Sequence, residues 1–338
     1  MPRFTLPSHE SSFRQTQVDR DGLLKGVKLE KAVGLDRLEV LAVVIPMIFI
    51  NPKTDFAFKK IFGSEQSKGI LISFLNSILY AGDSIIQDLT ILDPYQAPKI
   101  LGLKLSFLDV KARLSSGNWV IIEMQVLNVE GFEKRVLYNA TKTYSAQLNK
   151  GDEYEVLSPV IALTITDFKM FDDIDRPISR FVLREKESSV DYPISDLELV
   201  FVELPKFKIP LCDLKTLTDK WIYFLQNAKD LSVVPETMGA VAEIRQAFDI
   251  ANQAGLTREE LDLIERQLMY IQDQRGALTY ATRVAREQGL EQGLEEGLEQ
   301  GRSDMQRSIA QKLLPTFDDA TINQITGLTL EEIQLLRG

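Results

Sequence analysis

The chain has 338 residues, of which 44% are hydrophobic and 26% are charged. This composition excludes collagen-like, fully disordered and multi-span membrane proteins. Its one cysteine, Cys212, excludes a disulfide framework. Its one histidine, His9, leaves no Ser-His-Asp triad and no multi-histidine metal site. A metal ion would therefore be held by oxygen ligands, which favours Mg²⁺ or Mn²⁺.

The net charge of −10 is unevenly distributed along the chain. Residues 1–50 carry +1, residues 51–150 carry +3 and residues 151–338 carry −14. A nucleic-acid surface is expected in the middle segment, where phosphates meet the least repulsion. The longest apolar run, residues 38–50, is shorter than the roughly 20 residues that span a bilayer. We therefore expect a cytoplasmic protein without a membrane partner.

Residues 1–46 are predicted to be a disordered leader, or an extension upstream of a natural start at Met47, with a short helix near 21–33. A first folded domain is predicted over 47–210. Asp55 can cap a first short helix, and apolar residues at a 3.6 period predict a second helix over 67–80. Strands follow at 85–93, 103–114 and 118–128, then a helix at 131–149, a strand at 157–167 and a hairpin within 178–203. The order helix–three strands–helix–strand predicts an α/β core.

From residue 211 the pattern becomes helical, with a helical region at 211–285 and a repeat region at 286–338. Helices are predicted at 213–229, 236–254, 257–273 and 276–302, and two short helices within 305–336. Glycine recurs every four residues from Gly289 to Gly301, with leucine beside it. Such a stripe allows close helix contact and predicts a homo-oligomer; the alternative is a solvated helical linker that costs about 1 kcal/mol per glycine.

Two acidic residues could face each other across the hairpin of residues 103–128. Alternation places Asp109 and Lys111 on one face of the first strand, and Glu123 and Gln125 on one face of the second. A three-residue loop over 115–117, with Gly117 in the left-handed position, would set Asp109 opposite Glu123. A two-residue loop would instead place them on opposite faces. Two carboxylates that lie this close repel each other unless a cation sits between them.

Asp109 followed by Glu123-Met124-Gln125 on the next strand resembles the PD-(D/E)XK nuclease superfamily, whose motif is an Asp and then (D/E)-x-K. The strings NPKTDFAFKKIFG and LDVKARLSSGNWVIIEMQ, with the Gly-Glu-Gln-rich repeat near the C-terminus, resemble its family of recombination-promoting nucleases and transposases. The resemblance covers about residues 47–338. It implies a restriction-endonuclease-like α/β core followed by a helical C-terminal region.

The resemblance also implies roles for individual residues. Asp109 and Glu123 would hold Mg²⁺ (or Mn²⁺) with the Met124 carbonyl, and Asp55 would complete the site. Gln125 replaces the usual lysine and can only orient and hydrogen-bond. Lys111, on the same face as Asp109, could supply the missing positive charge.

DNA is the substrate class that the family implies, with metal-assisted hydrolysis of phosphodiester bonds as the reaction. Basic residues that could contact phosphates are Lys53, Lys59, Lys60, Lys99, Lys104, Arg113 and Lys142. Two functions remain open at this point. One is a DNA endonuclease linked to recombination or mobile elements. The other is a catalytically decayed nuclease fold that binds DNA or self-associates.

Overall fold

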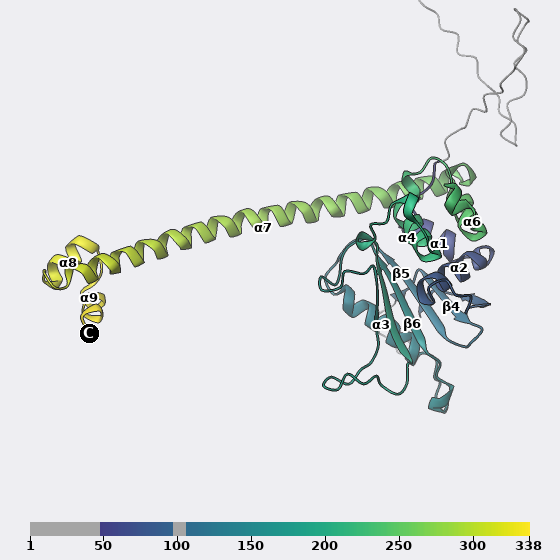
Figure 1. Cartoon of the computed structure of the whole chain (residues 1–338), viewed down its shortest axis with the longest axis horizontal. Coiled ribbons are helices and arrows are strands. Elements are labelled where there is room, and N and C mark those ends of the chain that lie inside the picture. The colour runs from purple at the N-terminus through teal and green to yellow at the C-terminus, as the bar shows by residue number, and fades with distance from the viewer. Residues whose placement is uncertain (1–47, 97–105) are drawn as a thin grey trace, which may run out of the picture. The chain divides into compact units, whose positions relative to one another are not determined.

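The structure is a computed structural model that describes residues 48–96 and 106–338 (Figure 1). The predicted leader with its helix near 21–33, and most of the apolar run at 38–50, lie outside the described residues. The helices are α1 (Asp55–Phe62), α2 (Lys68–Leu79), α3 (Phe132–Ser145), α4 (Leu217–Asn227), α5 (Glu236–Gly239), α6 (Ala242–Ala251), α7 (Arg258–Leu313), α8 (Asp319–Thr326) and α9 (Leu330–Arg337). The strands are β1 (Leu89–Leu92), β2 (Tyr95–Gln96), β3 (Ser106–Phe107), β4 (Val110–Leu114), β5 (Trp119–Gln125), β6 (Val160–Thr166), β7 (Ile178–Phe181) and β8 (Leu197–Glu203).

A six-stranded mixed sheet forms the centre of the fold, in the order β1-β4-β5-β6-β8-β7. The first three strands are antiparallel, β5, β6 and β8 are parallel, and β7 returns antiparallel to β8. Every residue of β6 is buried, as expected for the middle of a sheet that is covered on both faces. The predicted α/β core is confirmed, and the predicted hairpin within 178–203 extends its sheet through β8.

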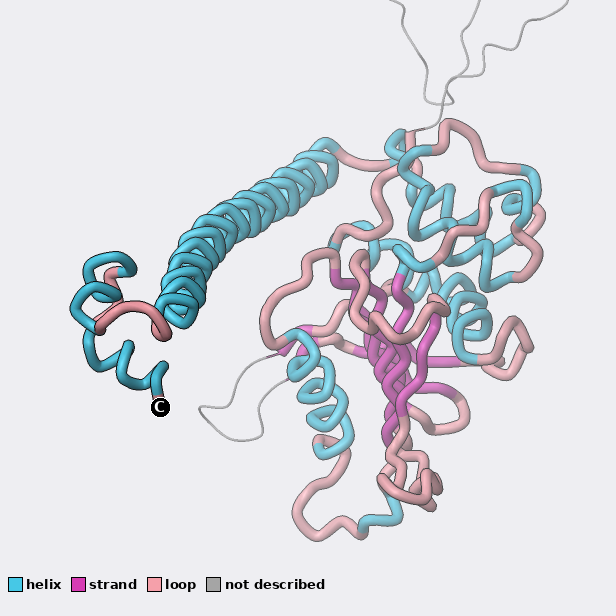
Figure 2. The backbone as a smooth tube through the Cα atoms, turned by 60° about the vertical axis from the view of Figure 1, so that its left-hand side comes forward, coloured by secondary structure: helices cyan, strands magenta, loops and turns pink. Residues whose placement is uncertain are grey.

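Helices cover both faces of the sheet (Figures 1 and 2). Even-numbered β5 residues such as Ile122 pack into a large core with α1, α2, α4 and α6. Odd-numbered residues such as Ile121 face α3, where Ala140 contacts the sheet. Since alternate residues of a strand point to opposite faces, the odd-numbered face of β5 that carries Glu123 is the α3 face.

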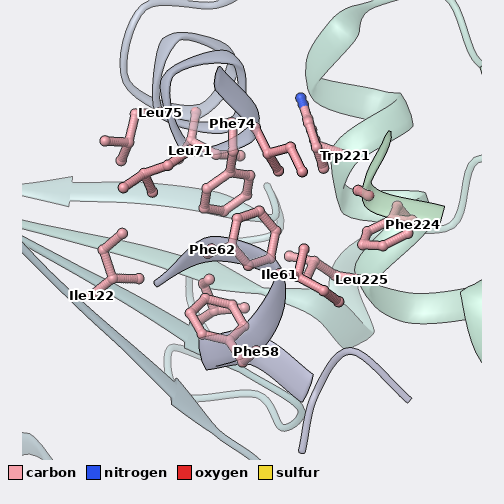
Figure 3. Packing of buried hydrophobic residues seen from close by; sticks show 14 of the residues in the cluster. Phe58, Ile61, Phe62, Leu71, Phe74, Leu75, Ile122, Trp221, Phe224 and Leu225 are labelled. Atoms are coloured by element: carbon pink, nitrogen blue, oxygen red, sulfur yellow. The ribbon is translucent and has the colours of Figure 1, made fainter. Parts of the chain in front are cut away.

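Aromatic rings fill the larger core, and they come from segments far apart in the sequence (Figure 3). Phe62 of α1 lies 4.9 Å from Phe74 of α2, measured between ring centroids, and Phe74 lies 5.8 Å from Trp221 of α4. The backbone adds a second link, because Ile50 donates its N–H to the Ala251 carbonyl at 2.8 Å. Residues of the predicted 47–210 domain and of the predicted 211–285 region therefore share one core.

Three details of the predicted helices are wrong. The helix predicted at 236–254 is two helices, α5 and α6. Thr54, not Asp55, caps α1, because the buried Thr54 hydroxyl accepts the Ala57 N–H. The helices predicted at 257–273 and 276–302 are one helix, α7, of 56 residues. It begins at a capping box of Thr257 and Glu260 and continues through Gly276 and the glycine repeat.

The C-terminal end of α7 packs against the two short helices that follow it. Ala310 and Ile322 are fully buried in a small cluster that also contains Leu328 and Ile333. The two short helices predicted within 305–336 are confirmed, with Asp318 as the cap of α8 and Thr329 as the cap of α9. None of the described helices is both long and apolar enough to cross a membrane.

The glycine repeat lies on an exposed stretch of α7. A side chain built at Gly289, Gly293, Gly297 or Gly301 would meet no described atom within 4 Å. The leucines beside the glycines are about two-thirds exposed. These observations fit a solvated helix, and self-association through the stripe stays a prediction.

Candidate active site

The β4–β5 hairpin brings the two acidic residues to the same end of adjacent strands. Leu114 donates its N–H to the Asn118 carbonyl at 2.8 Å, and Gly117 has a φ of +95°. The three-residue loop and the register from Val110 to Leu114 are therefore confirmed. The predicted pairing of Asp109 opposite Glu123 is wrong, because the alternation breaks before Val110: Asp109 donates its N–H to the Ile122 carbonyl at 3.2 Å, and Leu108 packs with Ile121 on the α3 face.

A cavity of about 700 Å³ lies at this end of the hairpin, and we call it the active pocket. Its lining combines acids from α1, β5 and the residue before β4 with polar, basic and aromatic side chains of α3. The lining residues are Asp55, Phe107, Asp109, Glu123, Met124, Gln125, Gly131, Lys134, Arg135, Tyr138 and Asn139. The hairpin and α1 supply the acids of the active pocket, and α3 supplies a basic wall.

Asp109 is held by a main-chain donor and by a neighbouring lysine. Its Oδ2 accepts the Met124 N–H at 2.7 Å, and its Oδ1 lies 3.6 Å from Lys59 Nζ. The same ammonium lies 2.6 Å from Asp55 Oδ1. Burial raises the pKa of Asp109 to about 7, and the nearby Asp55 adds to this rise, while the Met124 N–H and Lys59 oppose it. A cation placed at this carboxylate would relieve the cost of ionising it.

Glu123 is contacted by two residues of α3. Asn139 donates its side-chain N–H to Oε1, and Arg135 Nε lies 3.8 Å from Oε2. Burial raises the pKa of Glu123, and Arg135 and Asn139 oppose that shift without cancelling it. Both carboxylates are thus costly to ionise without a ligand.

Gln125 lies in the active pocket, in an orientation fixed by hydrogen bonds at both ends of its amide. Nε2 donates to the Leu127 carbonyl at 2.6 Å, and Oε1 accepts from Arg135 Nη2 at 2.5 Å. Lys111 is placed elsewhere and is not among the described residues that line the pocket. Its ammonium lies 5.2 Å from the Trp119 ring centroid. The cations near the carboxylates are instead Lys59 and Arg135.

Sequence reasoning missed the contribution of α3. Arg135, Tyr138 and Asn139 are spaced i, i+3 and i+4, which puts them on one helix face, and that spacing was the signal available in the sequence. Several other predicted phosphate contacts have protein partners instead. Lys53 bonds Asp167, Lys60 bonds Glu260, and Arg113 and Lys142 lie over the rings of Trp119 and Tyr138. Lys99 and Lys104 lie outside the described residues.

The donor set suits a hard divalent cation. Asp109 and Glu123 offer carboxylate oxygens, which Mg²⁺ and Mn²⁺ prefer. The buried Asn139 Oδ1 has no hydrogen-bond partner among the described residues.

The described residues contain no group of three or more His, Cys, Asp and Glu side chains arranged to hold a metal ion. A cation here would therefore rely on the two carboxylates and on main-chain or substrate oxygens.

The comparison with protein families agrees with this geometry. No curated protein and no solved structure matches the chain. The family model described as PD-(D/E)XK nuclease family transposase matches residues 52–281. That match covers more than half of the chain and includes every residue that lines the active pocket. The chain therefore belongs to the PD-(D/E)XK nuclease family transposases.

Proposed function

We propose that this protein is a DNA endonuclease that hydrolyses phosphodiester bonds with Mg²⁺ or Mn²⁺ at the active pocket, in the context of recombination or mobile elements. One observation carries the proposal. Asp109 and Glu123 line one pocket, burial raises the pKa of both, and a basic helix face lies beside them. Family membership supplies the reaction class.

Asp109, Glu123 and the Met124 carbonyl would hold the metal ion, which when bound supplies Lewis-acid activation of water and stabilisation of charge on the phosphate. The Met124 N–H orients the Asp109 carboxylate, and the Asn139 amide orients Glu123. Such orienting bonds fix ligand geometry and typically affect activity by about 10–100-fold. The chain therefore holds its two acids in place before the substrate arrives.

Basic side chains around the acids would bind the phosphates of the substrate. Lys134 and Arg135 line the active pocket from α3, and Lys59 lies at Asp109. Arg135 also contacts Gln125, the residue that stands where the family motif has lysine. We infer that Lys59 and Arg135 provide the positive charge that Gln125 lacks, whereas Lys111 is engaged with Trp119.

Nicking of supercoiled plasmid by the full chain with Mg²⁺ or Mn²⁺ tests the proposal. Asp109→Asn and Glu123→Gln should each lower the nicking rate by more than about 100-fold, because loss of an orienting partner alone costs 10–100-fold. Glu133→Gln is the matched control, since it removes the same charge from an exposed site on α3 outside the pocket lining. It should nick at the wild-type rate.

A binding measurement separates ligand loss from a general loss of activity. Mn²⁺ should raise the melting temperature of the wild type and of Glu133→Gln, and should leave Asp109→Asn unshifted. Folded wild type that neither nicks DNA nor responds to either metal would overturn the proposal and favour a decayed nuclease fold. Nicking retained in both site variants would place the chemistry elsewhere.

A further inference from the structure

A second cavity of about 390 Å³ adjoins the active pocket, and we call it the side pocket. It shares Asp55, Met124 and Gln125 with the active pocket. Its remaining lining comes from a residue before α1, from the two residues after β5 and from the first third of α7, namely Lys53, Val126, Leu127, Arg266, Gln267, Tyr270 and Ile271. A ligand held at the carboxylates would therefore lie directly beside the side pocket.

The α7 wall of the side pocket is tied to the core by polar contacts. Gln267 Oε1 accepts the Phe56 N–H at 3.2 Å, and Arg275 lies 2.7 Å from Asp167. Lys60 pairs with Glu260 near the start of α7. These contacts lie on both sides of Tyr270 along the helix, so the wall is in place without a ligand.

The chemistry of the side pocket combines apolar surface with a few polar groups. Met124, Val126, Leu127 and Ile271 supply the apolar surface, and the Tyr270 ring is 62% exposed. Arg266 adds a cation that bonds only its own helix among the described residues. A nucleobase has a matching character, because its flat π face stacks on aromatic rings and its edge carries donors and acceptors.

We propose that the side pocket binds an unpaired nucleobase next to the scissile phosphate, so that the preferred substrate is single-stranded or locally unpaired DNA. The inference rests on the proposed function, because that function makes DNA the ligand of the adjoining pocket. Because the two pockets share three lining residues, a base in the side pocket would lie close to a phosphate in the active pocket. In a paired duplex, that base would first have to leave its stack, at a cost of a few kcal/mol.

The distribution of charge supports a strand that runs past both pockets. Lys134 and Arg135 lie on the α3 side, and Arg266 lies on the α7 side. The acids Asp109 and Glu123 lie in the active pocket with the α3 cations. Phosphates on either side of the reacting one would meet cations, while the base between them stacks on Tyr270.

Metal-free binding of labelled oligonucleotides, measured by fluorescence anisotropy in EDTA, tests the side pocket without relying on catalysis. The full chain should bind a single strand more tightly than a duplex of the same sequence. Tyr270→Ala should weaken single-strand binding by about 10-fold, as for the loss of one stacked base. Tyr270→Phe should restore it, because the ring and not the hydroxyl provides the stacking.

Tyr280→Ala is the matched control. Tyr280 is also 62% exposed and lies on the same helix, but it does not line the side pocket. The Arg283 guanidinium lies over one face of its ring, 5.4 Å from the centroid. It should bind like the wild type. Unchanged binding by Tyr270→Ala, an equal loss in Tyr280→Ala, or tighter binding to the duplex would each overturn the inference.

Plasmid nicking keeps the two proposals apart. A wild type that does not nick but binds single strands through Tyr270 would refute the nuclease and retain the side pocket. If the wild type nicks plasmid but Tyr270→Ala binds single strands as tightly as the wild type, the side-pocket proposal is refuted and the nuclease proposal stands.

Discussion

Buried acids occur in two regions of this protein, and their surroundings differ. Glu203 lies at the end of β8 with no exposed surface. Its Oε1 accepts N–H groups from Met170 and Phe171 at 2.5 and 3.2 Å, and its Oε2 lies 2.6 Å from Lys206 Nζ. Lys206 in turn donates to the Phe171 carbonyl. The chain itself therefore compensates this charge.

Asp109 and Glu123 are nearly as enclosed, with 16% and 12% of their side chains exposed, yet their cations are farther away. Lys59 lies 3.6 Å from Asp109, and Arg135 lies 3.8 Å from Glu123. Burial therefore raises the pKa of both acids. The difference teaches that the fold can neutralise a buried carboxylate, and that at the active pocket it leaves two carboxylates less well compensated, as the proposed metal site requires.

Removing the cation beside Glu203 should have the largest effect. Lys206→Met leaves a buried carboxylate unpaired and should lower the free energy of unfolding by about 3–5 kcal/mol. Urea denaturation followed by circular dichroism measures the change. Lys208→Met, at an exposed position two residues away, should change it by less than about 0.5 kcal/mol. Equal stability of the two variants would break the comparison, because Glu203 would not need its partner.

Neutralising an acid of the active pocket should raise the free energy of unfolding, whereas Lys206→Met lowers it. In metal-free buffer at pH 8, Asp109→Asn should raise the free energy of unfolding by on the order of 1 kcal/mol, because it removes a charge that is costly to bury. For a domain of this size the melting temperature should rise by about 2–4 °C. Differential scanning fluorimetry with EDTA measures it. A melting temperature below that of the wild type would show that Asp109 stabilises the metal-free fold.

The difference in stability between Asp109→Asn and the wild type should depend on pH, because the pKa of Asp109 is raised in the folded chain. Asp109 has a pKa of about 7 in the folded chain and an ordinary value of 3.8, so between these values the folded state binds more protons than the unfolded state. Its ionisation therefore costs stability progressively as pH rises from about 4 to 7. The advantage of Asp109→Asn should be largest above pH 7, should fall by more than half by pH 5 and should vanish below pH 4.

The weakest expected effect is at Arg135, which is 43% exposed and lies 3.8 Å from Glu123. Arg135→Gln should change the free energy of unfolding by less than about 1 kcal/mol, because solvent screens such a pair. Urea denaturation beside Arg135→Lys, which keeps the charge, measures it. A loss as large as that of Lys206→Met would mean that Glu123 is compensated like Glu203.

Local patterns predicted the acidic part of the site well. The loop of residues 115–117 determines the register of β4 with β5, and that register brings Asp109 and Glu123 to the same end of the hairpin. The predicted strand and helix order also holds, because alternation and the 3.6 period report which face of each element is buried. These features depend only on neighbours in the sequence.

The remaining parts of the site depend on tertiary packing. No local signal tells that Tyr270 of α7 lies beside Gln125, because the contacts that hold α7 there link residues more than 100 positions apart. The break predicted between residues 273 and 276 does not form, because Gly276 costs a helix only about 1 kcal/mol and the contact between Arg275 and Asp167 holds this turn. Thr54 outcompetes Asp55 as the cap because its hydroxyl also donates to the Asn51 carbonyl.

The core shared by α1, α2, α4 and α6 has a consequence for how the chain can be divided. The connection between β8 and α4 contains exposed residues such as Lys208 and Lys215, where a protease can cut. Since Phe62 and Phe74 contact Trp221 across that connection, and Ile50 bonds Ala251, the two fragments would remain bound as a noncovalent complex. Fragments expressed separately would be expected to reassemble by complementation, with neither one behaving as an independent domain.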